Sequence, residues 1–256
     1  MRRFQDEVRS ALLKYALVPG LLIALICICL AALYWQRNVV MRTEEEARVA
    51  GEIFTELTHD YEAAAIAMNG TALLYGQAEE RRTYYERIYA ELNLHGTQPR
   101  FYLLDAERHP IFRTRSDVPA YLDAPSPHWG VFSRMDAQTG SVEEFVPHRD
   151  REWDYVVGQA IRPTATVGQP AVEGYAVFAI SMHELEKRLQ TGEKMHFVIV
   201  SREGRAPFST MTIFRDPVFY KIVPELADTH GLIEVEGQQF YAAQEPVLDG
   251  RFTIYA

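Results

Sequence analysis

The pattern of apolar positions begins with one long uninterrupted segment. Residues 16–35, ALVPGLLIALICICLAALYW, carry no charged side chain. At about 1.5 Å of rise per residue, a helix of this length spans roughly 30 Å, the thickness of the hydrocarbon core of a bilayer. Pro19 falls in the first turn, where a missing N–H costs little, and Tyr34 and Trp35 are placed like interfacial anchors. The pattern predicts one transmembrane helix, since the later apolar runs are too short to cross lipid.

The basic residues that flank this segment predict its orientation. Four precede it and two follow it, the latter with three glutamates close behind: Arg2, Arg3, Arg9, Lys14, Arg37 and Arg42. By the positive-inside rule, residues 1–15 are a cytoplasmic tail and the remaining ~220 residues lie on the outer side of the cytoplasmic membrane. A cleaved signal peptide is the alternative, but its apolar core is usually shorter and ends in a small-x-small site. We therefore expect an uncleaved anchor.

Beyond the span, the pattern becomes that of an amphipathic helix. From residue 36 to about residue 74, apolar side chains recur at three- and four-residue steps, with charged side chains between them. The apolar stripe consists of Ala47, Ala50, Ile53, Phe54, Leu57, Tyr61, Ala64, Ala65 and Met68. It packs only on its own domain or also pairs with a second copy as a parallel coiled coil; we expect a homodimer through this stalk. Glycines interrupt the pattern, and residues 78–92 predict a second helix, so that residues 36–95 form a helical stalk.

Short β-rich segments then occur in two successive groups. The first contains a hairpin, a proline-containing loop with a short helix, three strands and a closing helix, at residues 100–105, 109–114, 130–136, 141–146, 153–162, 174–181 and 182–190. The second repeats this order in miniature, at residues 196–200, 207–213, 217–227 (helical), 231–235, 238–247 and 251–255. The predicted fold class is α+β, with two antiparallel-sheet lobes at 96–192 and 193–256.

Charge and cysteine content narrow the class of protein. The formal net charge of −9 disfavours nucleic acid, whose binding needs a concentrated basic face. The two cysteines, Cys27 and Cys29, both lie inside the apolar span, one residue apart and on different faces of the helix. They cannot form a disulfide framework. The exported part has none, which suits a bacterial envelope protein.

This order of elements resembles the double Cache sensor domains, in which a stalk helix carries two stacked PAS-like lobes. Residues 103–108, Leu-Leu-Asp-Ala-Glu-Arg, resemble the hairpin turn of such lobes, with Arg108 where glycine is usual. Residues 174–185 resemble the strand and helix that close the distal lobe, and residues 199–204 the hairpin that opens the proximal lobe. The resemblance implies that the lobe at 96–192 is membrane-distal and binds a small molecule, and that the lobe at 193–256 is membrane-proximal.

The same resemblance bears on the ligand. Family members that bind amino acids carry an Arg-x-Trp-Tyr motif in the distal lobe and an aspartate near the end of the closing strand. Here the tryptophan of the motif falls on Trp129, without its arginine and tyrosine, and the aspartate position falls on Ala179. Without that carboxylate, a ligand ammonium would be buried and unpaired, at a cost of several kcal/mol. We therefore predict that the ligand is not a free α-amino acid.

Six side chains of the distal lobe are candidates for contact with this ligand. They are Trp129, Arg134, His128, Tyr102, Tyr155 and Tyr121. Trp129 fits a pocket wall or an ordinary core. Arg134 and His128 either pair with a ligand carboxylate or are solvated loop residues, and tyrosines on strands usually fill the face of a sheet.

The sequence lacks the motifs typical of catalysis. It has no His-x-Glu-x-x-His spacing, no Gly-x-Ser-x-Gly and no phosphate-binding glycine loop. We expect no enzymatic activity, cofactor or metal site in these residues. We predict that this chain is the extracytoplasmic sensor region of a bacterial transmembrane receptor. A two-component histidine kinase is the first choice for the receptor's output, and a chemoreceptor or a cyclase is the alternative. Because such receptors continue through a second membrane span, we expect this sequence to be part of a longer protein. An envelope interaction protein without a ligand and an anchored enzyme are the rival classes.

Overall fold

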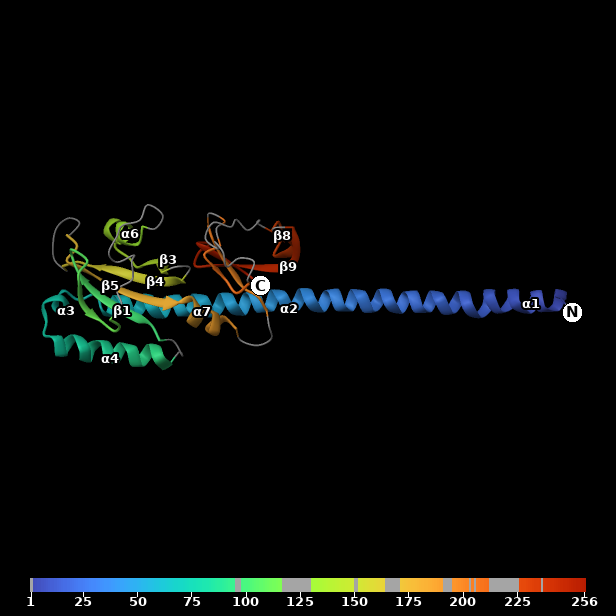
Figure 1. The fold of residues 1–256 in the computed structure, drawn as a ribbon, viewed down its shortest axis with the longest axis horizontal. Helices are drawn as coiled ribbons and strands as arrows, with labels where there is room; N and C mark the ends of the chain where they lie inside the picture. Colours follow the sequence, from blue (N-terminus) through green and yellow to red (C-terminus); the bar gives the residue numbers. More distant parts are fainter. Residues whose placement is uncertain are drawn as a thin grey trace.

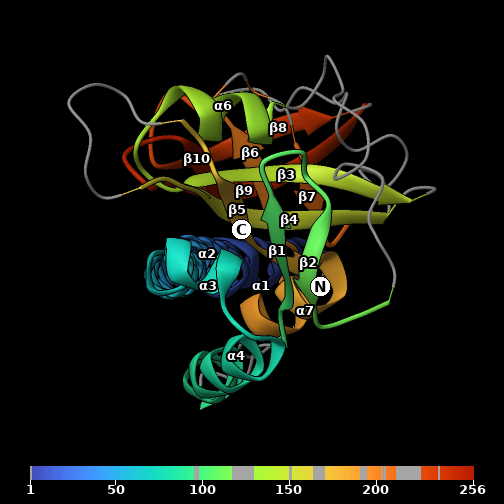
Figure 2. The same cartoon turned by 90° about the vertical axis from the view of Figure 1, so that its left-hand side faces the viewer.

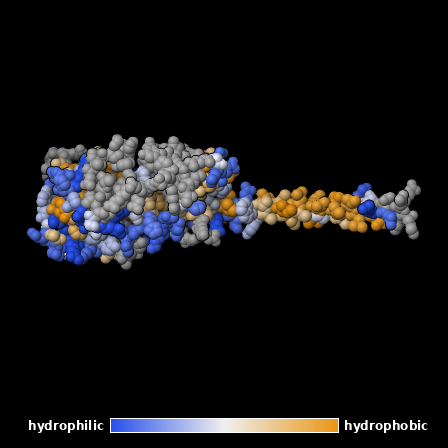
Figure 3. Space-filling view, viewed as in Figure 1, coloured by the Kyte–Doolittle hydropathy of each residue, from blue (hydrophilic) through white to orange (hydrophobic). Residues whose placement is uncertain are grey.

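A single rod of helix forms the N-terminal quarter of the chain (Figure 1). It consists of α1 (Arg2–Leu12), a π-helical turn (Leu13–Leu17) and α2 (Val18–Ala67). The computed structural model describes residues 2–94, 98–116, 130–149, 152–163, 171–190, 195–202, 204, 206–211, 226–235 and 237–256. Within these ranges, one helix is long and apolar enough to cross a membrane, as the sequence predicts. Figure 3 shows its apolar surface projecting from the folded part of the chain.

The stalk helix ends earlier than predicted. After Ala67 the chain makes a tight turn, in which the N–H of Asn69 donates to the carbonyl of Ile66 at 2.9 Å. Gly70 is extended, with φ −126° and ψ 120°, since glycine gains little from continuing a helix. Helix α3 (Thr71–Tyr75) and α4 (Ala78–Leu94) follow, and α4 runs back beside α2 (Figure 1). The prediction of one unbroken helix to residue 74 was therefore wrong, whereas the second helix is confirmed.

The first sheet has five antiparallel strands in the order β2-β1-β5-β4-β3. These strands are β1 (Arg100–Asp105), β2 (Pro110–Arg113), β3 (Val142–Arg149), β4 (Glu152–Ile161) and β5 (Gly174–Ser181). Helix α7 (Met182–Leu189) closes the unit and packs on α2. Helix α6 (Val131–Ala137) lies on the opposite side of the sheet from α2, as the end-on view shows (Figure 2).

The second sheet repeats this arrangement, in the order β7-β6-β10-β9-β8. Its strands are β6 (Val198–Ser201), β7 (Phe208–Ser209), β8 (His230–Val235), β9 (Gln238–Val247) and β10 (Phe252–Tyr255). The shared strand order confirms the predicted α+β fold with two PAS-like lobes. All but the last two residues of the helix predicted at 217–227 lie outside the described residues.

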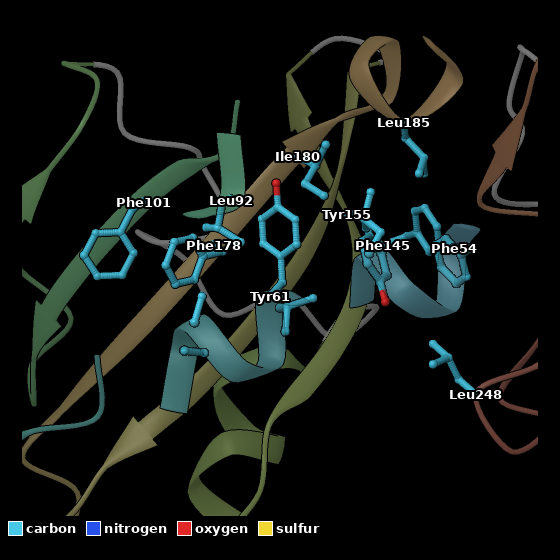
Figure 4. Packing of buried hydrophobic residues seen from close by; sticks show 14 of the residues in the cluster. Phe54, Tyr61, Leu92, Phe101, Phe145, Tyr155, Phe178, Ile180, Leu185 and Leu248 are labelled. Carbon is cyan, nitrogen blue, oxygen red and sulfur yellow. The ribbon is translucent and has the colours of Figure 1, made fainter. Parts of the chain in front are cut away.

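The apolar stripe of α2 is the centre of the main core. Eight of its nine predicted residues are at most 6 % exposed, and Ile53 is partly buried. Figure 4 shows Phe54 and Tyr61 of this stripe among side chains of the first sheet and of α7, with Leu248 from the turn between β9 and β10. Because this surface is used within the chain, the stripe packs on its own domain, and a second copy would have to meet another face of the stalk.

Candidate functional site

The face of the first sheet that looks away from α2 is covered by α6. Side chains alternate along each strand, so that Tyr102 on β1 and Tyr175 on β5 share this face. Together with α6 they enclose an apolar cluster: Tyr102, Leu104, Val131, Phe132, Met135, Val142, Val146, Val156, Ala160, Tyr175, Val177 and Ala179. We call this face the α6 face. The side chains of this cluster are buried against one another beneath α6, and polar groups lie at its margin.

A polar group lies at the β1–β2 end of the α6 face. The hydroxyl of Tyr175 donates to a carboxylate oxygen of Asp136 at 2.7 Å, and the Arg108 guanidinium lies 3.7 Å from the other oxygen. Arg108 also stacks over the Phe132 ring, 4.5 Å from its centroid. Burial and the bond to Asp136 raise the pKa of Tyr175 to about 12, so its hydroxyl remains a donor at neutral pH.

Arg108 occupies a backbone position that favours glycine. Its φ is 71°, and its N–H donates to the carbonyl of Asp105 at 3.0 Å. This left-handed conformation costs a non-glycine residue roughly 1–2 kcal/mol. The turn therefore has the geometry of the hairpin it resembles in sequence, and the arginine contributes contacts to α6 that glycine could not make.

A buried ion pair lies at the other end of the α6 face. Arg100 on β1 donates to Asp154 on β4, and their side chains are 8 % and 1 % exposed. Strand β5 lies between them, and Ala179 is the register partner of Arg100, so the small side chain of Ala179 allows the arginine to cross. Removing one partner of such a pair typically costs 3–5 kcal/mol, since a buried charge is left uncompensated. Neither Arg100 nor Asp154 was among the predicted contact residues. Each lies two residues from a buried side chain of the same strand, Tyr102 or Val156, and this spacing could have placed them on the same face of the sheet.

No family model and no curated protein matches this sequence. Solved structures with a similar fold do exist. The sensor domain of the V. cholerae histidine kinase DctB is 10 % identical, with a TM-score of 0.57; the alignment covers 86 % of this chain and 96 % of that one. The ligand-binding domain of the Pseudomonas aeruginosa PAO1 amino acid chemoreceptor PctB, in complex with L-Arg, is 15 % identical, with a TM-score of 0.61 and coverage of 86 % and 94 %. That of the Pseudomonas fluorescens chemoreceptor CtaA, in complex with L-isoleucine, is 12 % identical, with a TM-score of 0.58 and the same coverage.

The chain has the double Cache fold. The sheet that carries the α6 face packs on the end of α2 that is far from the exposed apolar segment at residues 16–35, and the second sheet lies nearer to that segment (Figure 1). At these identities the likeness shows the fold alone.

The structure separates the six predicted contact residues. Tyr102 lies fully buried on the α6 face, and Arg134 lies on α6 itself. The Arg134 guanidinium donates to the carbonyl of Glu143 at 2.5 Å. Tyr155 instead lies on the opposite face of the first sheet, toward α2, where its hydroxyl oxygen is 2.9 Å from that of Thr58 on α2. Tyr155 is therefore not part of the candidate site.

The remaining three predicted residues, Trp129, His128 and Tyr121, lie outside the described residues. Within the part of the chain that is described, no group of three side chains is arranged to hold a metal ion.

The second sheet carries a cavity of about 300 Å³ on its face away from α2. The cavity is lined mainly by apolar side chains such as Val198, Ile233 and Phe240.

The α6 face carries carboxylates although position 179 is an alanine. Ala179 is fully buried on the α6 face, but the neighbouring strand β4 carries the carboxylate of Asp154 on the same face. Asp136 supplies a second carboxylate at the margin. The comparisons do not support the exclusion of amino acids, since PctB and CtaA were solved with them. The alanine at position 179 therefore does not by itself exclude amino acids as ligands.

Proposed function

We propose that this chain is the extracytoplasmic ligand-sensing region of a bacterial transmembrane receptor, and that a small molecule binds at the α6 face of the membrane-distal lobe. The observation that carries the proposal is the α6 face itself: a buried apolar cluster bounded at both ends by charged side chains in a fold otherwise found in sensor domains. The exposed apolar rod supports a membrane anchor, with residues 1–15 cytoplasmic and 16–35 spanning the membrane.

We propose a carboxylate-bearing ligand other than a free α-amino acid. The carboxylates that would bind an ammonium already have cationic or donor partners, Asp154 with Arg100 and Asp136 with Tyr175 and Arg108. Arg134, by contrast, donates to a carbonyl oxygen and not to a carboxylate. A guanidinium has five N–H donors, so Arg134 could bind a ligand carboxylate through charge-assisted bonds while this bond is kept.

Thermal unfolding of the full chain in detergent, with a panel of amino acids and of short mono- and dicarboxylic acids, tests this proposal. A ligand at a hundred times its dissociation constant stabilises by about 2.7 kcal/mol. For a domain of this size that corresponds to a rise of about 5–10 °C in Tm. Arg134→Met should abolish the rise, and Arg82→Met, which removes an exposed arginine of α4, should leave it intact. A rise with amino acids alone would refute the proposed ligand class, and no rise with either set would count against the site.

For the output, we propose a histidine kinase, on the likeness to DctB, with a chemoreceptor as the second candidate on the likeness to PctB and CtaA. The ligand would act by favouring one of two packings of the distal lobe on α2, because a ligand shifts an equilibrium only through unequal affinities. Downstream sequence discriminates the two outputs.

We also propose a homodimer through the stalk. It would use the exposed face of α2 that carries the ion pairs of Arg48 with Glu45 and Glu52, because the apolar stripe is buried within the chain. Sedimentation of the full chain in detergent checks it. A monomer at tens of micromolar would refute it.

A further inference from the structure

The two sheets and α2 meet at a cluster of four aromatic rings. Phe54 of α2 lies 5.0 Å from Tyr155 of β4 and 5.9 Å from Phe252 of β10, measured between ring centroids. Phe145 of β3 lies 5.5 Å from Phe252. Figure 4 shows Phe54, Phe145 and Tyr155 together, with Leu248 approaching from the second lobe. We call this cluster the lobe junction. It is a packed, rigid contact, through which a small displacement in one lobe can reach the other.

A buried carboxylate lies beside the lobe junction. Glu143 of β3 is 4 % exposed, and one of its oxygens accepts a hydrogen bond from the guanidinium of Arg251, which comes from the other lobe. Its second oxygen has no hydrogen-bond partner among the described residues. Burial raises the pKa of Glu143, with Glu62 adding to the rise, while Arg251 and Arg134 oppose it. Only the carboxylate of this pair is buried, and the cost of desolvating it offsets much of the attraction, so the pair adds little to stability.

The turn that presents Arg251 is tightly constrained. Leu248, Asp249 and Gly250 have φ values of 50°, 56° and 74°, which is rare for the two residues that are not glycine. The Arg251 side chain also donates from Nε to the Leu248 carbonyl at 2.9 Å, and its carbonyl accepts from the N–H of Arg202 at 3.0 Å. Such strain persists only where the surroundings hold it, so the guanidinium is fixed relative to the second sheet.

Glu143 is also held from the α6 side. The Arg134 guanidinium, which belongs to α6, donates to the backbone carbonyl of Glu143. A single residue of β3 thus contacts α6 through its main chain and the second lobe through its side chain. Ser141, at the start of the same segment, donates to Glu62 of α2 at 3.0 Å.

We propose that Arg134, Glu143 and Arg251 form a relay that couples the position of α6 to the second lobe. A displacement of α6 moves the main chain at Glu143, and the Glu143–Arg251 pair passes that movement to the β9–β10 turn. The relay rests on the proposed function only for the origin of the displacement, namely a ligand at the α6 face. It adds a second route into the membrane-proximal lobe, besides α2.

Hydrogen exchange of the full chain in detergent tests the relay without a ligand. Arg134→Met removes the contact of α6 with the Glu143 carbonyl and so releases the main chain there. The readout is exchange of the backbone amides at residues 247–252, where the turn bonds of Gly250 and Arg251 lie. In the otherwise native chain we expect exchange there to rise about threefold, within the range of couplings between residues of one network. In an Arg251→Met background, the same perturbation should change it less than about 1.5-fold.

The controls separate coupling from general loosening. Arg251 is 44 % exposed, so its replacement by Met opens no large cavity, but it leaves the buried carboxylate of Glu143 without its cation. Exchange in the core strand β5 is therefore followed alongside, to separate a change at residues 247–252 from a loss of global stability. Arg251→Lys, which keeps the charge, should restore most of the response. Glu143→Gln, which removes the charge from the other side, should suppress the response as Arg251→Met does. Arg82→Met, which breaks an exposed pair of α4 remote from Glu143, should leave residues 247–252 unchanged.

An equal response in the native and Arg251→Met backgrounds, or no response in either, would overturn the relay. The ligand panel has a separate outcome. If no ligand is found but the exchange response depends on Arg251, the relay stands and the proposed function fails. If a ligand binds but the exchange response does not depend on Arg251, the proposed function stands and the relay fails.

Discussion

Replacing Phe54 with alanine tests whether α2 joins the two lobes into one cooperative unit. Phe54 is fully buried, and its ring contacts Phe145 and Tyr155 of the first sheet and Phe252 of the second. Truncating a buried phenylalanine typically costs 3–5 kcal/mol, through lost burial and the cavity that remains. Alanine is a better helix former than phenylalanine, which returns about 0.5 kcal/mol. The expected net loss is about 3–4 kcal/mol.

The assay is thermal unfolding of the full chain in detergent, followed by circular dichroism and by tyrosine fluorescence. At about 2–4 °C per kcal/mol for a domain of this size, Tm should fall by roughly 6–16 °C. Both signals should shift together, since the lost ring contacts belong to both sheets. The matched control is Ile66→Ala, on the same helix but 58 % exposed, which should change stability by less than about 0.5 kcal/mol. Separate transitions, of which only one shifts, would refute the reasoning that Phe54 unites the lobes.

Three further predictions concern single groups and are checked by chemical denaturation. Thr58→Val should destabilise the chain by about 1–2 kcal/mol more than Tyr155→Phe does. The Thr58 change leaves the buried hydroxyl of Tyr155 without its partner, whereas the Tyr155 change removes that hydroxyl. Equal losses of stability in the two variants would contradict this prediction. The pKa of Glu143 is raised in the folded state, so ionising this carboxyl lowers the free energy of unfolding. Relative to Glu143→Gln, the native chain should therefore lose stability as pH rises from about 4.5 toward 7. A gain in stability over this range would contradict the prediction. The charged groups that set this balance are Arg251, Arg134 and Glu62. Asp249→Gly should stabilise by at most about 1 kcal/mol, because Asp249 is exposed at φ 56°; a loss would show that its side chain is needed in the turn.

Local patterns predicted most of the elements of this fold. The stripe from Ala47 to Met68 has helical spacing, and the hairpin around Asp105 has a polar turn between β-rich segments, so each was visible within a few residues. The repetition of the same order of elements predicted two similar lobes, which the two sheets confirm. The error at residues 68–70 was one of boundary, where a turn ends a helix whose apolar pattern continues into α3.

The candidate site was predicted only in part, because most of its contacts are long-range. Tyr102 and Tyr155 are both tyrosines on predicted strands, yet the sheet places them on opposite faces, one toward α6 and one toward α2. Composition and hydropathy do not distinguish the two faces when both are buried. The Arg100–Asp154 pair was missed because the two residues are 54 positions apart and no strand order was available to bring them together.

The sequence by itself determined the apolar span, the amphipathic stalk, the α+β class and the lack of catalytic motifs, because hydropathy period and residue type act locally. Only the tertiary structure decided which surface the stalk stripe covers, which face of the first sheet is left for α6, and that Glu143 meets Arg251 across 108 positions. The physical reason is that strand pairing and the burial of charge depend on residues far apart in the chain, whose proximity exists only once both lobes have packed on α2.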